Sequence, residues 1–247
     1  MIKNEEILIT SNGKEQGFFL KKGYRSQTRN NTLDANRSSN YWDFNRIVNS
    51  AWDQADCYRY AKNYVMNSKN SILEIGCGTL IKQNRFYFSN GLGKTYYCMD
   101  QENSFKIASQ LGVINKNMKI LTCDLEQDMS KAIEYFNTNN EKISTILCFD
   151  VIEHLFNPSN LLKMIKEVAN KDTEIIFSTP ERDLKRGKDM MESNKAEHVR
   201  EWNQEEYSRL VEYFGFSVKE IKIVQDTDMR EDCLTTMVVR CGIKQNV

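Results

Sequence analysis

The chain has 247 residues, and its 34 basic side chains balance its 34 acidic ones, so the formal net charge is zero. This length suits one large α/β domain with a sizeable core. The charge balance gives no support to a nucleic-acid-binding surface or to one that docks on an anionic membrane, and no apolar run is long enough to span a bilayer.

The seven cysteines are an odd number and form no CxxC pair. Cys77, Cys98, Cys123 and Cys148 lie in or just after apolar runs, which favours buried free thiols in a reducing compartment. The N-terminus carries no apolar signal-peptide segment. We therefore expect a cytoplasmic protein.

Residues 1–40 are predicted to be an N-terminal extension, because they are polar, rich in turn formers and poor in core positions. The hypothesis for this extension is that part of it orders over a substrate. Residues 41–68 carry aromatic side chains at helical spacing, and Tyr60, Ala61, Tyr64 and Val65 would share one face of a helix. Residues 41–247 are expected to form a single domain.

Short apolar runs then alternate with helical stretches, at residues 71–75, 95–99, 118–123, 143–149 and 173–178. This alternation predicts an α/β, Rossmann-like, doubly wound sheet covered on both faces. A helix is expected from 204, with Asn203 as its N-cap and Gly215 at its end. Residues 216–224 and 233–241 complete a mostly parallel, seven-stranded sheet as a C-terminal antiparallel hairpin.

The first of these strands runs into a glycine loop, in the sequence ILEIGCGTL at residues 72–80. Gly76 and Gly78 permit a tight turn and a close approach of backbone to a ligand. A dinucleotide site needs a further glycine three residues after Gly78, where Ile81 stands, which argues against NAD. The loop is therefore predicted to bind another ligand at the carboxyl end of the sheet.

A carboxylate lies in or near the end of each of the first four strands: Glu74, Asp100, Asp124 and Asp150. A single aspartate more often starts a turn or caps a helix. Four in equivalent positions favour a ligand site, since a carboxylate at a strand end can accept two ribose hydroxyls or an amino group.

The segments ILEIGCG, MDQEN, CDLEQD and FDVIEHL resemble the class I S-adenosylmethionine-dependent methyltransferases, over about residues 70–180. The resemblance implies S-adenosylmethionine as cofactor and S-adenosylhomocysteine as product. It places the methionine part in the loop, the ribose at Asp100, the adenine at Asp124 and the sulfonium end near Asp150. The implied cofactor-binding residues are Glu74, Gly76, Cys77, Gly78, Asp100, Gln101, Asp124, Leu125, Asp150 and Val151. Leu80 departs from the third glycine of the family, and we expect a modest change in loop shape.

The two histidines of the chain are the candidates for chemistry at the methyl acceptor. His154 lies one helical turn past a strand end and His198 lies in KAEHVREWN, so both map to the rim of the predicted pocket. A lone histidine is more often a surface or capping residue, but one here could take the proton of a hydroxyl acceptor. Glu153 could orient an imidazole or bind a sugar hydroxyl. We expect a metal-free mechanism, because Asp150 and Glu153 have no second carboxylate pair beside them to hold Mg²⁺.

Residues 181–203 form the predicted acceptor-side segment, which is polar and crowded with charge. Arg182 and Arg186 could clamp a diphosphate, or the loop could simply be solvated. Its sequences STPERDLKRG and HVREWN, the latter with Arg200, resemble methyltransferases of bacterial glycan assembly. The resemblance implies an O-methyltransferase for a sugar or nucleotide-linked sugar of capsule or O-antigen synthesis, for example a GDP-heptose.

Two other hypotheses stay open. The same fold could methylate another acceptor, such as a quinone-type phenol, an amine or RNA, although a lipid-like acceptor should favour an apolar lid. The chain could also be a non-catalytic S-adenosylmethionine-binding module. We expect a small-molecule partner and no nucleic acid, and the sequence does not decide between a monomer and a homodimer.

Overall fold

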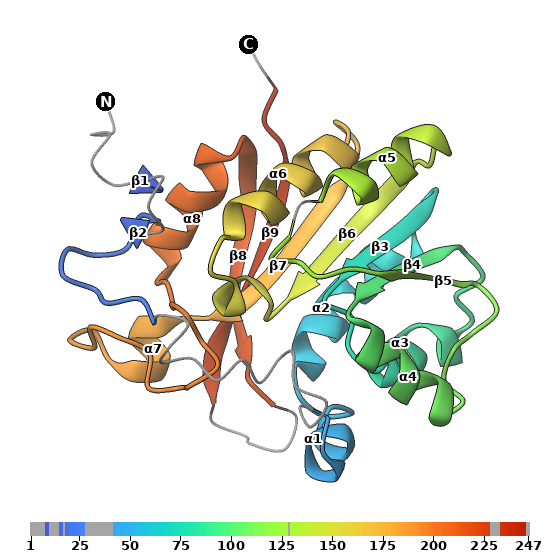
Figure 1. Cartoon of the computed structure of the whole chain (residues 1–247), viewed down its shortest axis with the longest axis horizontal. Helices are drawn as coiled ribbons and strands as arrows, with labels where there is room; N and C mark the ends of the chain where they lie inside the picture. Colours follow the sequence, from blue (N-terminus) through green and yellow to red (C-terminus); the bar gives the residue numbers. More distant parts are fainter. Residues whose placement is uncertain are drawn as a thin grey trace.

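The computed structural model of the chain describes residues 8–9, 15–16, 18–27, 42–127, 129–227 and 233–245. Its centre is a seven-stranded sheet in the order β5-β4-β3-β6-β7-β9-β8 (Figure 1). The strands are β3 (Ser71–Ile75), β4 (Tyr96–Asp100), β5 (Met118–Thr122), β6 (Ile143–Phe149), β7 (Glu174–Pro180), β8 (Phe216–Gln225) and β9 (Leu234–Ile243). Two short strands, β1 (Leu8–Ile9) and β2 (Glu15–Gln16), pair separately.

The predicted fold class is confirmed. Strands β3 to β7 pair in parallel, and β9 lies antiparallel between β7 and β8. From β3 the chain first adds β4 and β5 on one side and then β6 and β7 on the other. Strand order therefore reverses between β3 and β6, and a crevice for a ligand opens beyond the carboxyl ends of these two strands.

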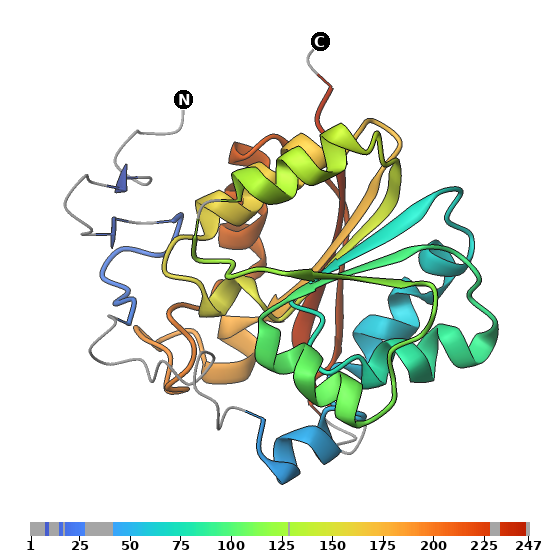
Figure 2. The same ribbon diagram turned by 45° about the vertical axis from the view of Figure 1, so that its right-hand side comes forward.

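Helices cover both faces of the sheet (Figure 2). One apolar core lies beneath α2 (Ala55–Met66), α3 (Ile81–Phe86) and α4 (Glu102–Gln110), and the other beneath α5 (Ser130–Thr138), α6 (Pro158–Val168) and α8 (Gln204–Tyr213). Helix α6 begins with Asn157 as N-cap and a proline in the first turn, and it buries Leu161, Leu162 and Ile165 at helical spacing. Asn203 is the N-cap of α8, as predicted, and it also forms a capping box with Glu206.

The segment with aromatic residues at helical spacing contains two helices, α1 (Phe44–Asn49) and α2. The break lies at Gln54, whose φ of 61° is left-handed and cannot continue a right-handed helix. Ala61 and Val65 are buried, and Tyr60 and Tyr64 pack on the same core, so the predicted apolar face belongs to α2.

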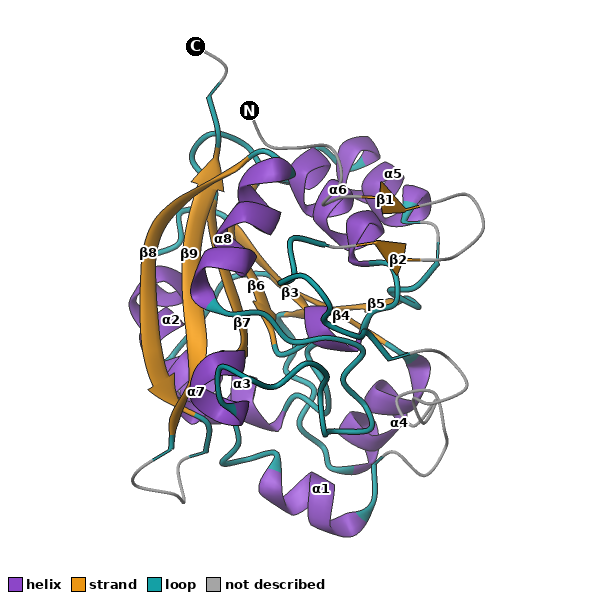
Figure 3. Cartoon of the chain, turned by 90° about the vertical axis from the view of Figure 1, so that its left-hand side faces the viewer, coloured by secondary structure: helices purple, strands orange, loops and turns teal. Residues whose placement is uncertain are grey.

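Residues 18–27, blue in Figure 1, run along the acceptor-side segment, which begins with the short helix α7 (Arg182–Arg186), labelled in Figure 3. Backbone hydrogen bonds join Arg25 to Met191 and Gln27 to Val199, each at 2.7 Å. Phe18 and Phe19 are buried in the core. The part of the predicted extension at residues 28–40 lies outside the described residues.

All seven cysteines are free, in line with the expected thiols. Within the described ranges, no helix combines the length and the apolar character needed to cross a membrane.

Candidate active site

A cavity of about 820 Å³ lies at the carboxyl ends of β3 to β6. This volume is near the upper end of the range for small-molecule sites, so it has room for a cofactor and a small acceptor. Of the residues predicted from the sequence, these line it: Gly76, Gly78, Asp100, Gln101, Asp124, Leu125, Asp150, Val151, Glu153, His154, Arg186 and His198.

The glycine loop needs its glycines for two separate reasons. Gly76 has φ +70°, and a Cβ there would lie 2.2 Å from Cγ2 of Val151. Gly78 has φ +63°, and a Cβ there would meet the ring of Trp42 at 3.2 Å. Leu80 stands in place of the third glycine. It also adopts a left-handed φ, of 63°, and its side chain is buried. This left-handed conformation of a non-glycine residue places local strain on the backbone at Leu80.

Glu74 does not line the cavity, which differs from its predicted place around the methionine part. It is 1% exposed, and both carboxylate oxygens are used inside the protein. Oε1 accepts the Tyr58 hydroxyl, while Oε2 accepts Nε2 of Gln83 at 2.7 Å and the Tyr96 hydroxyl at 2.5 Å. Gln83 also donates to the carbonyl of Cys77 at 2.9 Å. Glu74 therefore fixes the loop from beneath, and Cys77 is likewise buried outside the cavity lining.

Asp100 ties the loop to the next helix. Its Oδ2 accepts the amide of Gly78, and its Oδ1 accepts the amide of Gln101 and the hydroxyl of Ser104, at 2.7, 2.7 and 2.8 Å. Burial raises the pKa of Asp100, against the lowering effect of these donors. Each carboxylate has about four acceptor sites, so capacity remains for ribose hydroxyls.

Asp124 and Asp150 stand at the following strand ends. Asp124 accepts the amide of Glu126 at 3.1 Å and lies on the cavity wall. Asp150 has a left-handed φ of 50°, and it accepts the hydroxyl of Ser178 at 2.6 Å and Nε2 of Gln54 at 3.0 Å. Both carboxylates are therefore held in place before any ligand binds.

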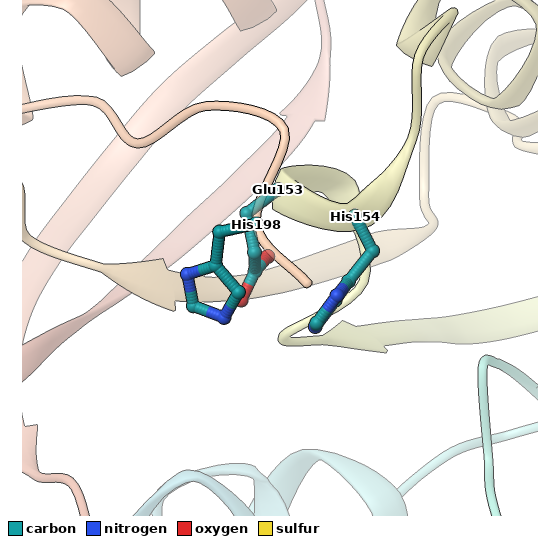
Figure 4. Close-up of side chains that lie close together, drawn as sticks. All are labelled: Glu153, His154 and His198. Atoms are coloured by element: carbon teal, nitrogen blue, oxygen red, sulfur yellow. The ribbon is translucent and has the colours of Figure 1, made fainter. Parts of the chain in front are cut away.

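Glu153, His154 and His198 come together at one end of the cavity, from η4 (Ile152–His154) and the acceptor-side segment (Figure 4). The two imidazole rings are 4.7 Å apart in an edge-to-face arrangement. Nδ1 of His154 lies 2.9 Å from the carbonyl of Glu197, and Nδ1 of His198 lies 2.5 Å from Oε1 of Glu201. A carbonyl or carboxylate only accepts, so Nδ1 carries the hydrogen in both rings and Nε2 keeps its lone pair.

The charges of this cluster are set by burial. Burial lowers the pKa of both imidazoles, well below the ordinary value in His154, so both rings are neutral near pH 7. Burial and the nearby Asp150 raise the pKa of Glu153 well above its ordinary value. Burial also raises the pKa of Glu201, but hydrogen bonds from His198 and Arg186 outweigh it and lower the value to about 2.

The predicted substrate arginines are engaged within the protein. Arg182 is 1% exposed and pairs with Glu206 and Asp183. Arg200 is fully buried and donates to the carbonyls of Leu155 and Phe156. Neither lines the cavity. Arg186 does, but its guanidinium is bound to both oxygens of Glu201, at 3.0 and 2.8 Å.

Sequence reasoning missed several residues of the cavity wall: Trp42, Gln54, Lys82 and Lys195. It also missed Glu201 behind the wall. Trp42 covers Gly78 and donates to Ser104 at 3.0 Å, while Lys82 donates to Gln54 at 2.5 Å. The sequence HVREWN, in which Glu201 follows His198 by three residues, is a local signal for Glu201. No local signal indicated these four missed residues of the wall.

A family model described as a methyltransferase domain matches residues 54–221 of the chain. No curated protein sequence matches. Among solved structures, a SAM-dependent methyltransferase from Aquifex aeolicus is 16% identical, with a TM-score of 0.56 over 85% of this chain and 99% of that one.

A second structure is the 1,6-didemethyltoxoflavin-N1-methyltransferase of Burkholderia thailandensis, with bound 1,6-didemethyltoxoflavin and S-adenosylhomocysteine. It is 14% identical, with a TM-score of 0.53 over 76% of this chain and 79% of that one. At such identities these two structures show a shared fold alone, and the family model shows the family.

Proposed function

The chain belongs to the methyltransferase-domain family and is a class I S-adenosylmethionine-dependent methyltransferase, and from this premise we propose that it methylates a hydroxyl of a sugar or nucleotide-linked sugar. The single observation that carries the proposal is the polar acceptor end of the cavity, where two neutral imidazoles and a carboxylate converge.

On this proposal the cofactor occupies the crevice between β3 and β6. Asp100 accepts the ribose hydroxyls, since its two oxygens retain acceptor capacity beside the loop amides. Asp124 and Leu125 meet the adenine, and the loop at Gly76 and Gly78 borders the methionine part. Glu74 and Cys77 act indirectly, by holding that loop in shape.

The acceptor end suits a hydroxyl better than an amine or a carbon. S-adenosylmethionine supplies the methyl group: the bond from sulfur to the methyl carbon breaks as the bond from that carbon to the acceptor oxygen forms. The hydroxyl must lose its proton, and a neutral imidazole with a free Nε2 can take it. Positioning of the oxygen in line with the methyl supplies much of the rate.

The polar character of the cavity wall supports a sugar acceptor. Besides the histidine pair, the wall carries Lys185, Arg186, Asn194, Lys195, Glu197 and Asp226. These side chains can bind several hydroxyls, whereas a quinone or other lipid-like acceptor would need an apolar lid. Lys195 has no salt bridge among the described residues, so it replaces the buried arginines as the candidate contact for a diphosphate.

The test is a screen of nucleotide sugars and free sugars with purified protein, with mass spectrometry for the gain of one methylene. We expect one acceptor to be methylated and S-adenosylhomocysteine to form with it. His154→Asn and His198→Asn should cut turnover while the affinity for S-adenosylhomocysteine holds.

Three results would contradict the proposal in different ways. Methylation of an extracted quinone precursor, but of no sugar, would change the acceptor class. Full turnover in both histidine variants would remove the imidazoles from the reaction. No S-adenosylhomocysteine with any cell extract would favour a non-catalytic binding module.

A further inference from the structure

The potential ligand atoms of Glu153, His154 and His198 all lie within 4.8 Å of one another, so a single ion placed between them could contact all three. We propose that these three side chains together bind a divalent cation at the acceptor end of the cavity. The role given to this cation rests on the proposed function, because it would hold the acceptor hydroxyl. The binding site itself rests on the geometry of the three residues.

The outer contacts of both imidazoles are those of metal ligands. A metal-binding histidine almost always donates its second ring hydrogen to a carboxylate or a backbone carbonyl, which fixes the ring and the tautomer. His198 makes the first kind of contact, to Glu201, and His154 makes the second, to the carbonyl of Glu197. The nitrogen left over in each ring is Nε2, so both rings are already in the form that binds a cation.

The carboxylate of Glu153 lacks a partner for one of its oxygens. The side chain is fully buried, and Oε2 accepts the hydroxyl of Thr179 at 3.1 Å, while Oε1 has no hydrogen-bond partner among the described residues. A buried polar atom without a partner is costly, and a carboxylate that carries its charge in the interior is normally paired or bound to a metal. A cation between Oε1 and the two imidazoles would satisfy this oxygen.

The ligand set indicates the kind of metal. Two imidazoles and one carboxylate are typical of Mn²⁺, Fe²⁺, Co²⁺ or Zn²⁺, whereas Ca²⁺ and Mg²⁺ prefer all-oxygen sites. Three protein ligands leave coordination positions open for an acceptor oxygen. With a cation bound, the imidazoles would act as metal ligands in place of the base role described above. The cation would lower the pKa of that hydroxyl, and the proton would pass to solvent, because both Nε2 lone pairs are bound to the metal. The resulting alkoxide oxygen forms its bond to the methyl carbon as the carbon–sulfur bond breaks.

The test uses the tag-free full chain, dialysed against a chelator and titrated with Mn²⁺ alone, with the free-ion signal followed by electron paramagnetic resonance. Mn²⁺ is the probe because it avoids the seven cysteine thiols. We expect one Mn²⁺ per chain. Glu153→Gln and His154→Gln should weaken binding by more than about tenfold, since loss even of an outer contact costs about 10–100-fold.

Glu174→Gln is the matched control, because Glu174 pairs on the surface with Lys219 and Arg240 and should leave Mn²⁺ binding unchanged. Retained S-adenosylhomocysteine binding shows that each variant is folded. Absence of Mn²⁺ binding in the parent protein, or equal binding in the folded Glu153→Gln variant, would overturn the site. Sugar methylation that continues after treatment with the chelator would contradict a role for the metal in the reaction but support the proposed function. Mn²⁺ binding without methylation of any sugar would support the metal site but contradict the proposed function.

Discussion

His198 donates the hydrogen on Nδ1 to Oε1 of Glu201, with 2.5 Å between the two atoms. Arg186 holds both oxygens of the same carboxylate, and Ser193 donates to Oε1 at 3.1 Å. Glu201 is fully buried, so its position is fixed from inside the protein. The contact orients the ring of His198 and leaves Nε2 free at the cavity.

Glu201→Gln tests whether this contact matters for turnover. The amide keeps the size of the side chain but removes its charge, which weakens both the His198 contact and the Arg186 pair. We expect turnover to fall by about 10–100-fold, as for the loss of other contacts that orient a functional histidine. The affinity for S-adenosylhomocysteine, measured by calorimetry, should stay the same, because Glu201 does not line the cavity.

Glu192→Gln is the control in the same segment. Glu192 is 49% exposed and pairs with Arg25 on the surface, so its loss should change neither quantity. A Glu201→Gln variant with the turnover of the parent protein would show that His198 is positioned without this carboxylate.

Asp100→Ala should abolish measurable binding of S-adenosylmethionine. The carboxylate both accepts the Gly78 amide and is proposed to bind the ribose, so the variant loses the ligand contact and loosens the loop. Asp100→Asn keeps the shape and should weaken binding by roughly tenfold or more, because a hydrogen bond to a charged group contributes about 1.5–3 kcal/mol. Isothermal titration calorimetry gives both affinities.

The control for Asp100 is Asp172→Ala. Asp172 is an exposed residue just before β7, so it lies at the amino end of the parallel strands, opposite the cavity. Its variant should bind the cofactor like the parent protein. Unchanged affinity in Asp100→Ala would remove that residue from the ribose site.

The sheet could be predicted from the sequence because its signals are local. Each parallel strand is a short apolar run, and each run lies between helical stretches, so five strands were found to within about two residues. The break between α1 and α2 could not be predicted, because the left-handed Gln54 at that point is held by a contact with Asp150, 96 positions away in the chain.

At the acceptor end of the cavity, contacts between residues far apart in the chain limit prediction from the sequence even more. Arg182 was expected either to clamp a diphosphate or to lie in a solvated loop, but Glu206, 24 positions further on, holds it in the interior. Glu153 was expected to orient an imidazole or to bind a sugar hydroxyl, but its complete burial beside Thr179 and the histidines was not foreseen. Pairings across such distances leave no periodic trace in the sequence.

Gly76→Ala should disrupt the cofactor loop, because the new Cβ would lie 2.2 Å from Val151 in a backbone conformation that disfavours side chains. Gly91→Ala is the matched control: it also has positive φ, at +85°, but its Cβ would meet open space. Gly91→Ala should cost about 1 kcal/mol of unfolding free energy and keep cofactor binding. Gly76→Ala should cost more and lose cofactor binding.

The double variant Gly76→Ala/Val151→Ala separates the two causes. Removal of the Val151 methyl groups relieves the clash but not the backbone strain, so partial recovery of binding is expected. If Gly76→Ala binds the cofactor as well as Gly91→Ala does, the close approach to Val151 does not constrain the loop.

Arg182→Met should destabilise the fold without a specific effect on the acceptor. The guanidinium is buried between Glu206 and Asp183, and its loss leaves the Glu206 carboxylate, 8% exposed, without its partner. Breaking such a buried pair costs about 3–5 kcal/mol. Urea unfolding measures the loss, and the KM for the sugar should be unchanged wherever the variant is folded.

Arg25→Met is the control for Arg182, because it removes an arginine from an exposed pair, with Arg25 67% and Glu192 49% exposed. Water and salt screen such a pair, so its loss should cost at most about 1 kcal/mol. The comparison decides between the two roles of Arg182. A stable Arg182→Met protein with a strongly raised KM would return this arginine to the substrate site, whereas a large loss of stability at constant KM places it in the framework that carries His198.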